Sequence, residues 1–196
     1  MATTPVRQNT SNSKIKSPRT PGFTGTVASS RVENIIYSCI EQHRKWKSAV
    51  DKGSQFCNAI SNAKLSTLQS EGQLPYPENV ILYCKNMRIL ITIFEDALLN
   101  AETCLTHIKS LESSFEASAV IGQTWNFQKI VSVLETIVTS YKNEFCTRSH
   151  ISENIGHTMS TEQLKLYVRG WNSMMDLERD RELQFHMMMY EFRFSG

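Results

Sequence analysis

The longest regular pattern in the chain is an apolar run between Val80 and Phe115. Its apolar side chains recur at intervals of three and four positions over five heptads. They are Val80, Tyr83, Met87, Leu90, Phe94, Ala97, Ala101, Cys104, Ile108, Leu111 and Phe115. Such intervals place side chains along one face of a helix. Because a lone helix cannot cover that face, we predict that other helices of the chain pack on it.

The same periodicity predicts a second long helix, nearer the N-terminus. It follows a capping-box sequence that starts at Ser30, and it covers about residues 31–70 before a glycine and two prolines end it. Gly53 and Lys64 interrupt its apolar face, and Gly53 is the position where a bend is expected.

A third long helix is predicted over residues 124–155, and its periodic row includes Arg148. Ser160 then begins another capping box, which leads into a short helix through Trp171. A last helix, rich in methionine, ends near Tyr190.

These elements define the predicted fold. Since no strand-like alternation longer than a few residues occurs, we predict that residues 30–196 form an all-α domain. Short connections favour an elongated antiparallel bundle of three long coiled-coil-like helices, with two shorter C-terminal helices. The two short helices are expected either to cap one end of the bundle or to extend to a partner.

Residues 1–29 differ in composition from the rest of the chain. They are rich in Thr, Ser, Pro, Asn and Gly and hold few large apolar side chains, so we expect a disordered tail. Residues 1–31 carry a net charge of +5, whereas the remaining 16 basic and 19 acidic residues leave the body at −3. A mildly acidic body gives little support to direct nucleic-acid binding.

Composition also bears on the compartment. No apolar run reaches the ~20 residues of a membrane span, and the N-terminal residues lack the apolar core of a secretory signal. The five cysteines are odd in number and widely spaced, which favours free, mostly buried thiols over disulfides or a metal site. We therefore expect a soluble intracellular protein that does not enter a membrane.

The tail contains three Ser/Thr-Pro pairs, which are the minimal acceptors of proline-directed kinases. Thr4, Ser17 and Thr20 each precede a proline, and Arg7 gives Thr4 the fuller pattern that cyclin-dependent kinases prefer. We name these three residues as candidate phosphorylation sites with a regulatory role. The alternative is that such pairs are simply common in disordered tails.

Candidate catalytic chemistry is sparse. Metal-binding bundles use Glu-x-x-His pairs, and none occurs here. Cys146 and His150 have a spacing that would suit two zinc ligands, but further ligands are lacking nearby. No glycine-rich phosphate loop is present. We expect no enzymatic activity, catalytic residue, metal or cofactor; a metal-dependent bundle oxidoreductase is the least favoured alternative.

Large apolar side chains are concentrated towards the C-terminus. The candidate partner-docking residues are Trp125, Tyr167, Trp171, Met187, Met188 and Tyr190. Aromatic residues and methionine are enriched at protein interfaces, and residues 187–190 are apolar around a whole helical turn, which one bundle face cannot bury. The alternative interpretation is that these side chains cover one end of the bundle.

Several short segments share residue types, order and spacing with one known family. They are Lys45-Trp46 with Asp51 and Gly53, the segment 58–65, Thr124-Trp125 with Phe127, Tyr141-Lys142-Asn143-Glu144, His157-Thr158, Leu164, Tyr167 and Trp171, then Leu183, Met188 and Glu191. On these segments the chain resembles the cyclin-dependent kinase 2-interacting protein family of animals. The resemblance covers most of residues 30–192 and is weakest between residues 80 and 115. It departs at Met174-Met175, where the family carries a proline.

The resemblance implies a non-enzymatic adaptor in the nucleus. Members of the family bind a cyclin-dependent kinase and the Cdc-seven-type kinase, together with origin and checkpoint factors, in DNA replication, cell division and DNA damage repair. They also resemble subunits of an AAA ATPase assembly that acts in chromatin-protein turnover and ribosome biogenesis. The alternative, from a different class, is a self-associating structural coiled coil of a cytoskeletal or kinetochore type.

Overall fold

The computed structural model describes residues 23–68, 77–173 and 175–194. In chain order the helices are α1 (Phe23–Leu68), α2 (Glu78–Ser110), the short 3-10 helix η1 (Glu112–Ser114), α3 (Phe127–Asn154), α4 (Thr161–Asn172) and α5 (Met175–Glu191). Within these residues the only strand-like pairing is an isolated bridge between Val120 and Asn126. The all-α prediction, with three long helices and two shorter ones, is confirmed.

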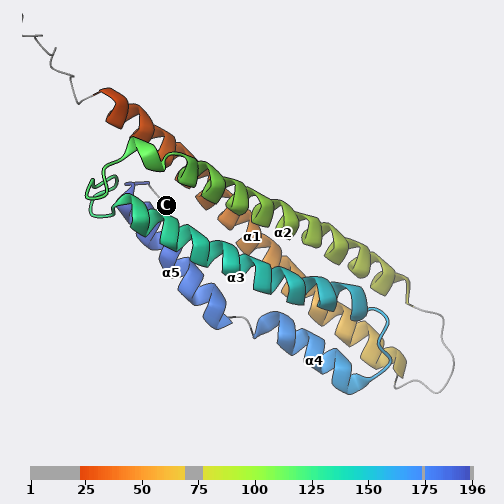
Figure 1. The fold of residues 1–196 in the computed structure, drawn as a ribbon. Helices are drawn as coiled ribbons and strands as arrows, with labels where there is room; N and C mark the ends of the chain where they lie inside the picture. The colour runs from red at the N-terminus through yellow and green to blue at the C-terminus, as the bar shows by residue number, and fades with distance from the viewer. Residues whose placement is uncertain (1–22, 69–76, 174, 195–196) are drawn as a thin grey trace, which may run out of the picture.

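The helices form an elongated bundle with four positions in cross-section. The long helices α1, α2 and α3 run antiparallel, with α2 packed against both of the others. The shorter α4 and α5 follow one another along the remaining side, and both contact α1 and α3 (Figure 1). Together they complete an up-down-up-down bundle whose fourth helix is broken in two. The expectation that they cap one end of the bundle is therefore wrong, and their extension to a partner stays a prediction.

The predicted start of the first helix needs correction. The first helix begins at Phe23 and not near residue 31, so Ser30 lies inside α1 and does not cap it. Residues 23–29 are helical, so the predicted disordered tail cannot extend to residue 29. Packing explains the difference, because Ala28 and Val32 are both buried. The rest of the tail lies outside the described residues, and so do Thr4, Ser17 and Thr20.

The end of α2 also differs from the prediction. Helix α2 ends at Ser110, five positions before the predicted Phe115, and the chain turns through η1. Phe115 nevertheless reaches the core from this turn, where its ring stacks on that of Phe127 at 5.5 Å between centroids. The apolar periodicity thus continued past the helix, because a turn can also deliver side chains to the core.

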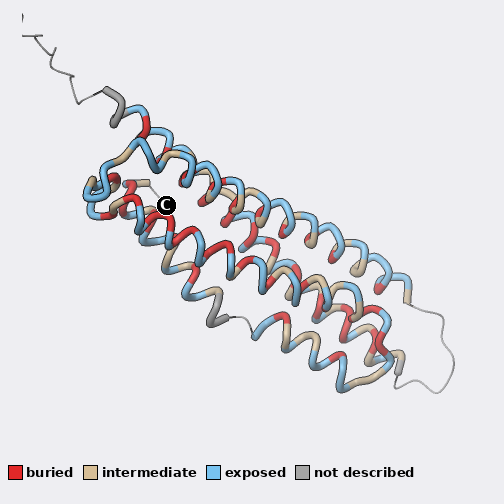
Figure 2. The backbone as a smooth tube through the Cα atoms, viewed as in Figure 1, coloured by how far each residue is buried: buried red, intermediate tan, exposed pale blue. Residues whose placement is uncertain are grey.

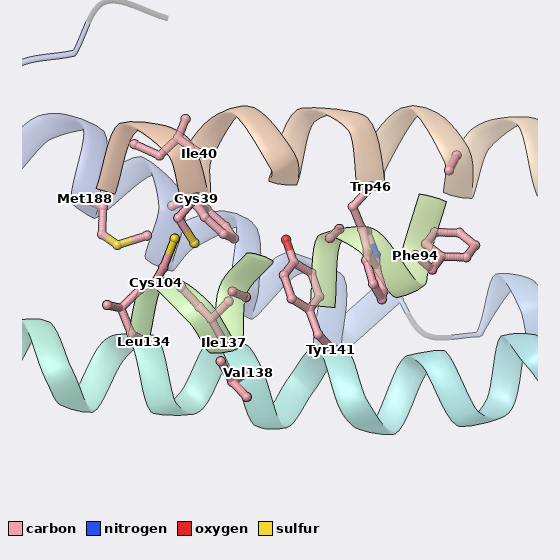
Figure 3. Close-up of a cluster of buried hydrophobic side chains, with 14 of the residues drawn as sticks. Cys39, Ile40, Trp46, Phe94, Cys104, Leu134, Ile137, Val138, Tyr141 and Met188 are labelled. Atoms are coloured by element: carbon pink, nitrogen blue, oxygen red, sulfur yellow. The ribbon is translucent and has the colours of Figure 1, made fainter. Parts of the chain in front are cut away.

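The predicted seam of α2 is the centre of the core. Residues coloured as buried in Figure 2 lie on the facing sides of the helices along the bundle. Those of α2 are Val80, Met87, Leu90, Phe94, Ala97, Ala101, Cys104 and Ile108. Around them gather side chains from α1, α3 and α5, including Ile40, Ile137 and Met188 (Figure 3). The seam is therefore closed within a single chain.

All five cysteines lie within the described residues; none of them forms a disulfide, and three are buried, as the sequence predicted. Cys39 and Cys104 meet between α1 and α2, with their sulfur atoms side by side (Figure 3). The hydrogen bond to Cys104 and burial together hold the pKa of Cys39 well above its ordinary value, so that side chain stays a thiol.

Side chains cap two of the helices at their N-termini. Asn126 Oδ1 accepts a hydrogen bond from the backbone N–H of Lys129 at 2.9 Å and so begins α3. Ser160 Oγ accepts from the N–H of Gln163 at 3.3 Å, which confirms the cap predicted for α4. Among the described helices, none combines the length and the apolarity that crossing a bilayer demands.

Candidate functional site

The core contains charged side chains where α4 ends and α5 begins. On α3, Glu144 and Arg148 are fully buried, and Arg181 of α5 is 2% exposed. Glu144 accepts hydrogen bonds from both arginines, from Arg148 at 3.3 Å and from Arg181 through its other oxygen. Arg148 also donates to Glu178 in the first turns of α5. We call these four residues the ion network; it ties α5 to α3.

Aromatic rings enclose both guanidinium groups of the ion network. The Arg148 guanidinium lies 4.7 Å from the ring centroid of Trp171 and 5.5 Å from that of Phe94. The Arg181 guanidinium lies 4.8 Å from the Tyr141 ring and 5.4 Å from the Trp46 ring. A cation over an aromatic face is attracted by the ring quadrupole, more strongly where water is excluded. The rings thus help to offset the cost of burying charge.

The hydrogen bonding of this region is incomplete. Within the described residues, Nε1 of Trp46 and the Nε atoms of Arg148 and Arg181 are buried without a hydrogen-bond partner. A buried donor without a partner costs free energy. The ion network is therefore held by charge pairing and ring contacts, and it is sensitive to the loss of any one member.

His43 of α1 extends the polar contacts towards the surface. Its Nε2 lies 2.9 Å from Glu182 Oε2, and its Nδ1 lies 3.0 Å from the hydroxyl of Tyr141. An ionised carboxylate only accepts, so we assign the proton of the neutral ring to Nε2, and the Tyr141 hydroxyl donates to Nδ1. Lys47 adds a bond to the other oxygen of Glu182 at 2.8 Å. His43 is therefore a buried histidine with hydrogen bonds at both ring nitrogens.

The electrostatics of this group favour the neutral histidine. Burial lowers the pKa of His43 to about 4, with the Arg181 and Lys47 charges acting in the same direction and Glu182 opposing them. Although burial raises the pKa of Glu182, its hydrogen bonds from Lys47 and His43 outweigh that effect and lower it to about 2. At neutral pH the pair is therefore a neutral imidazole donating to a carboxylate.

Trp171 joins α4 to α1. Its Nε1 donates to the carbonyl of Val50 at 3.1 Å, and its own carbonyl accepts from Arg148 at 3.4 Å. The indole fills the space above Gly53, where an added Cβ would lie 2.0 Å from Cζ2 of the ring. Helix α1 continues unbroken through this position. Gly53 is therefore a notch for the indole, which explains the interruption in the apolar pattern.

Lys64, the other interruption in α1, closes the end of α3. Its side chain is 4% exposed, and Nζ donates to the carbonyl of Gly156 at 2.6 Å. A cation at a helix C-terminus satisfies carbonyls left without intrahelical partners and complements the helix dipole. Burial lowers the pKa of Lys64.

Glu191, at the end of α5, holds the loop that precedes α3. Its carboxylate accepts from the backbone N–H of Thr124 at 2.7 Å, from the Thr124 hydroxyl and from the N–H of Trp125 at 3.2 Å. Burial raises the pKa of Glu191, but these bonds outweigh it and hold the pKa below its usual value. An added Cβ at Gly122 would lie 2.9 Å from the same carboxylate. Both ends of α5 are thus anchored by carboxylates.

The six candidate docking residues lie in different environments. Trp125, Trp171 and Met188 are buried within the chain, and Tyr167 is half-buried. Met187 is 40% exposed and Tyr190 is 70% exposed. Met187 and Tyr190 therefore offer the largest apolar surface of the six to a partner; the three buried side chains belong to the core.

The exposed apolar surface of α5 has one more member, which the list of candidates missed. Leu183 is 60% exposed and lies four and seven positions before Met187 and Tyr190, so the three share one helical face. The spacing alone would have identified it. We call Leu183, Met187 and Tyr190 the outer α5 stripe.

Comparisons with known proteins add no family to this description. No protein-family model matches the chain, and a search of curated proteins finds no match. Within the described residues, no three His, Cys, Asp or Glu side chains are grouped so that they could hold a metal ion. The structure itself defines the class: an antiparallel four-helix bundle whose broken fourth helix is held by a buried ion network.

Proposed function

We propose that the chain is a non-enzymatic adaptor and that a protein partner docks on the outer α5 stripe. The observation that carries the proposal is the two-sided character of α5. Its inward side chains Arg181, Phe185 and Met188 are buried. Each residue of the outer α5 stripe follows one of these inward residues by two positions. Two residues of a helix correspond to a rotation of roughly 200°. The stripe therefore faces away from the core.

The ion network supports this role by fixing the rotation of α5. Arg181 can reach Glu144, and Glu178 can reach Arg148, only if this side of α5 faces α3. The outer α5 stripe is then presented on a rigid element, with anchors at i, i+4 and i+7. This is the spacing by which helices dock into apolar grooves of partner proteins. Preorganisation of this kind lowers the entropy cost of binding.

The resemblance supplies the proposed partners. On that basis the chain joins a cyclin-dependent kinase, a Cdc-seven-type kinase, origin and checkpoint factors and AAA ATPase subunits in the nucleus. The proposed processes are DNA replication, cell division, DNA damage repair, chromatin-protein turnover and ribosome biogenesis, with the tail as a phosphorylated regulatory segment. The self-associating alternative loses its main support, because the heptad seam of α2 is buried by the chain's own helices.

Purification of the tagged full chain from nuclei, followed by mass spectrometry, tests the proposal. The triple variant Leu183→Glu, Met187→Glu, Tyr190→Glu is expected to lose the kinase or ATPase subunits at least about tenfold, because it places charge in a buried contact. The control is Leu166→Glu on α4, since Leu166 is 65% exposed and lies outside the stripe.

Circular dichroism should show an unchanged helical signal for both variants. If the triple variant recovers every partner at the wild-type level, the outer α5 stripe is not the docking surface. If the wild-type chain recovers neither kinase nor ATPase subunits, the adaptor function itself is wrong. A dimer of the pure chain in light scattering would instead favour the self-associating structural protein.

A further inference from the structure

We propose that the groove between α1 and α2 binds an acidic amphipathic helix of a partner protein. Two adjoining hollows of about 440 and 330 Å³ make up the groove, and they share Lys45 and Ile93 in their walls. The groove lies on the α1–α2 side of the bundle, whereas α5 packs against α1 and α3. It is therefore a surface separate from the outer α5 stripe and independent of the function proposed above.

The α2 wall of the groove presents apolar side chains at Leu90, Ile93 and Leu99, with Asp96, Asn100 and Thr103 as its polar members. Leu90 and Ala49 form the floor, and both are buried. Ile93 is half-buried beside them, and Leu99 is 61% exposed at the far end. Ile89 lies one turn from Ile93 and is 60% exposed. These side chains offer a row of apolar contacts about as long as three helical turns.

The α1 wall of the groove is cationic. Arg44, Lys45 and Lys52 line it and are exposed. Arg44 is paired with Glu41 at 2.6 Å. Lys45 and Lys52 form no ion pair among the described residues, so their charges are left for a ligand. Acidic side chains in the lining are limited, within the same residues, to Asp96 beside the larger hollow.

Spacing and charge together define the ligand. Lys45 and Lys52 are seven positions apart on one helix, which separates them by about 10 Å along the axis. A helix lying in the groove would meet them with two acidic side chains that are also seven positions apart. Its apolar side chains, at i, i+3 or i+4 and i+7, would lie on Ile93 and Leu99. A basic helix would meet like charge and be rejected.

The larger groove between α2 and α3 shows that charge distinguishes the two surfaces. It measures about 950 Å³, and its lining carries both signs, with Lys85 and Arg88 on α2 and Glu95 and Glu153 on the two walls. Such a lining favours neither an acidic nor a basic ligand. The α1–α2 groove has a clear excess of cations and therefore a defined complement.

Two designed helical peptides with the same leucine positions test the proposal. One carries glutamates seven positions apart beside the leucines, and the other carries lysines there. In fluorescence anisotropy with the full chain, the glutamate peptide is expected to bind at least about tenfold more tightly than the lysine peptide. Added salt should weaken that binding, because exposed charges are screened.

Variants of the chain test whether the peptides bind in the α1–α2 groove. The double change Lys45→Glu, Lys52→Glu is expected to weaken binding of the glutamate peptide about tenfold and to strengthen binding of the lysine peptide. Loss of folding would not strengthen the binding of either peptide. The matched control is Lys85→Glu, Arg88→Glu, with the same change of charge on the α2–α3 side; it should leave both affinities nearly unchanged. The proposal is overturned if neither peptide binds, if both bind alike, or if the control weakens binding equally. The proposal is also overturned if the wild-type chain dimerises and the Lys45→Glu, Lys52→Glu variant does not, because the groove would then bind a second copy of the chain.

Discussion

Helices α2 and α5 pack into the same bundle by different means. Helix α2 buries an uninterrupted apolar row, from Val80 to Ile108, against α1 and α3. Helix α5 is about half as long and combines two buried apolar side chains, Phe185 and Met188, with the charged Arg181 and Glu178.

The difference teaches what each kind of contact can specify. Apolar burial is strong but non-directional, so a smooth seam such as that of α2 tolerates exchange among side chains of similar size. Paired charges are directional and costly to misplace, so the ion network specifies one rotation of α5 on α3. The long helix is therefore held by its apolar seam, and the short one is positioned by its charges.

The comparison is tested most severely by removing the shared carboxylate. Glu144→Ala leaves Arg148 and Arg181 buried without their common partner, and we expect a loss of about 3–5 kcal/mol in the free energy of unfolding. Urea unfolding followed by circular dichroism measures the change. The milder Glu144→Gln keeps an acceptor and should show a smaller loss, which provides a measurement if the alanine variant does not fold.

An exposed ion pair is the matched control for that loss. Glu102 of α2 and Lys142 of α3 form a bridge of 2.7 Å between side chains that are 39% and 55% exposed. Glu102→Ala should cost less than about 1 kcal/mol, because water already solvates both charges. Equal losses of unfolding free energy for Glu144→Ala and Glu102→Ala would contradict the view that burial makes the ion network important for stability.

The junction between α1 and α4 gives the next largest effect. In Gly53→Ala the new methyl group would overlap the indole of Trp171, which its bond to Val50 holds in place. Forced overlap in a packed core costs about 1–3 kcal/mol, so we expect destabilisation despite the better helix propensity of alanine.

Gly170 provides the opposite case on the partner helix α4. A Cβ there would lie 3.4 Å from Cδ1 of Ile151, an ordinary contact. Gly170→Ala should therefore stabilise the chain by about 0.5–1 kcal/mol in the same unfolding experiment. If both glycine variants shift stability in the same direction, Trp171 does not occupy a notch that only glycine can form.

The same contrast explains how much of the fold the sequence could predict. The apolar residues of a seam such as that of α2 recur at a regular spacing of three and four positions. That spacing predicts both the helix and the residues on its buried face. The period also placed Arg148 in an apolar row, but it could not reveal that Glu144 and Arg181 neutralise it there. Gly53 and Lys64 were visible as interruptions; their explanations, Trp171 and Gly156, lie far along the chain.

The candidate site was harder to predict than the fold. Apolar type alone selected Trp125, Trp171 and Met188, which pack inside because a helix with apolar residues all round must bury some of them. The segments that carry the resemblance turn out to pair in space: Gly53 with Trp171, and Thr124 with Glu191. Short sequence segments shared with a family can thus reflect contacts inside the fold. They do not by themselves identify a docking surface.

A dependence of stability on pH is expected from the titration of His43. Its pKa of about 4 lies below the value of roughly 6.5 expected in the unfolded chain, so between these values the unfolded state binds more protons. Stability is then full above the unfolded pKa and falls as the pH is lowered. From pH 7 to pH 5 the expected loss from this residue is about 2 kcal/mol.

The physical cause lies in the groups that face the ring. Protonation at Nδ1 would remove the acceptor to which the Tyr141 hydroxyl donates. It would also place a cation near Arg181 and Lys47, with Glu182 alone opposing. Glu182 itself, with a pKa of about 2, loses its contribution only below roughly pH 4.5, so the two effects separate on the pH axis. Unfolding free energies at pH 7, 6 and 5 should therefore decline more steeply for the wild-type chain than for His43→Gln. Parallel declines would show that His43 is not neutral in the folded bundle, and that α5 is not held against α1 by a neutral imidazole.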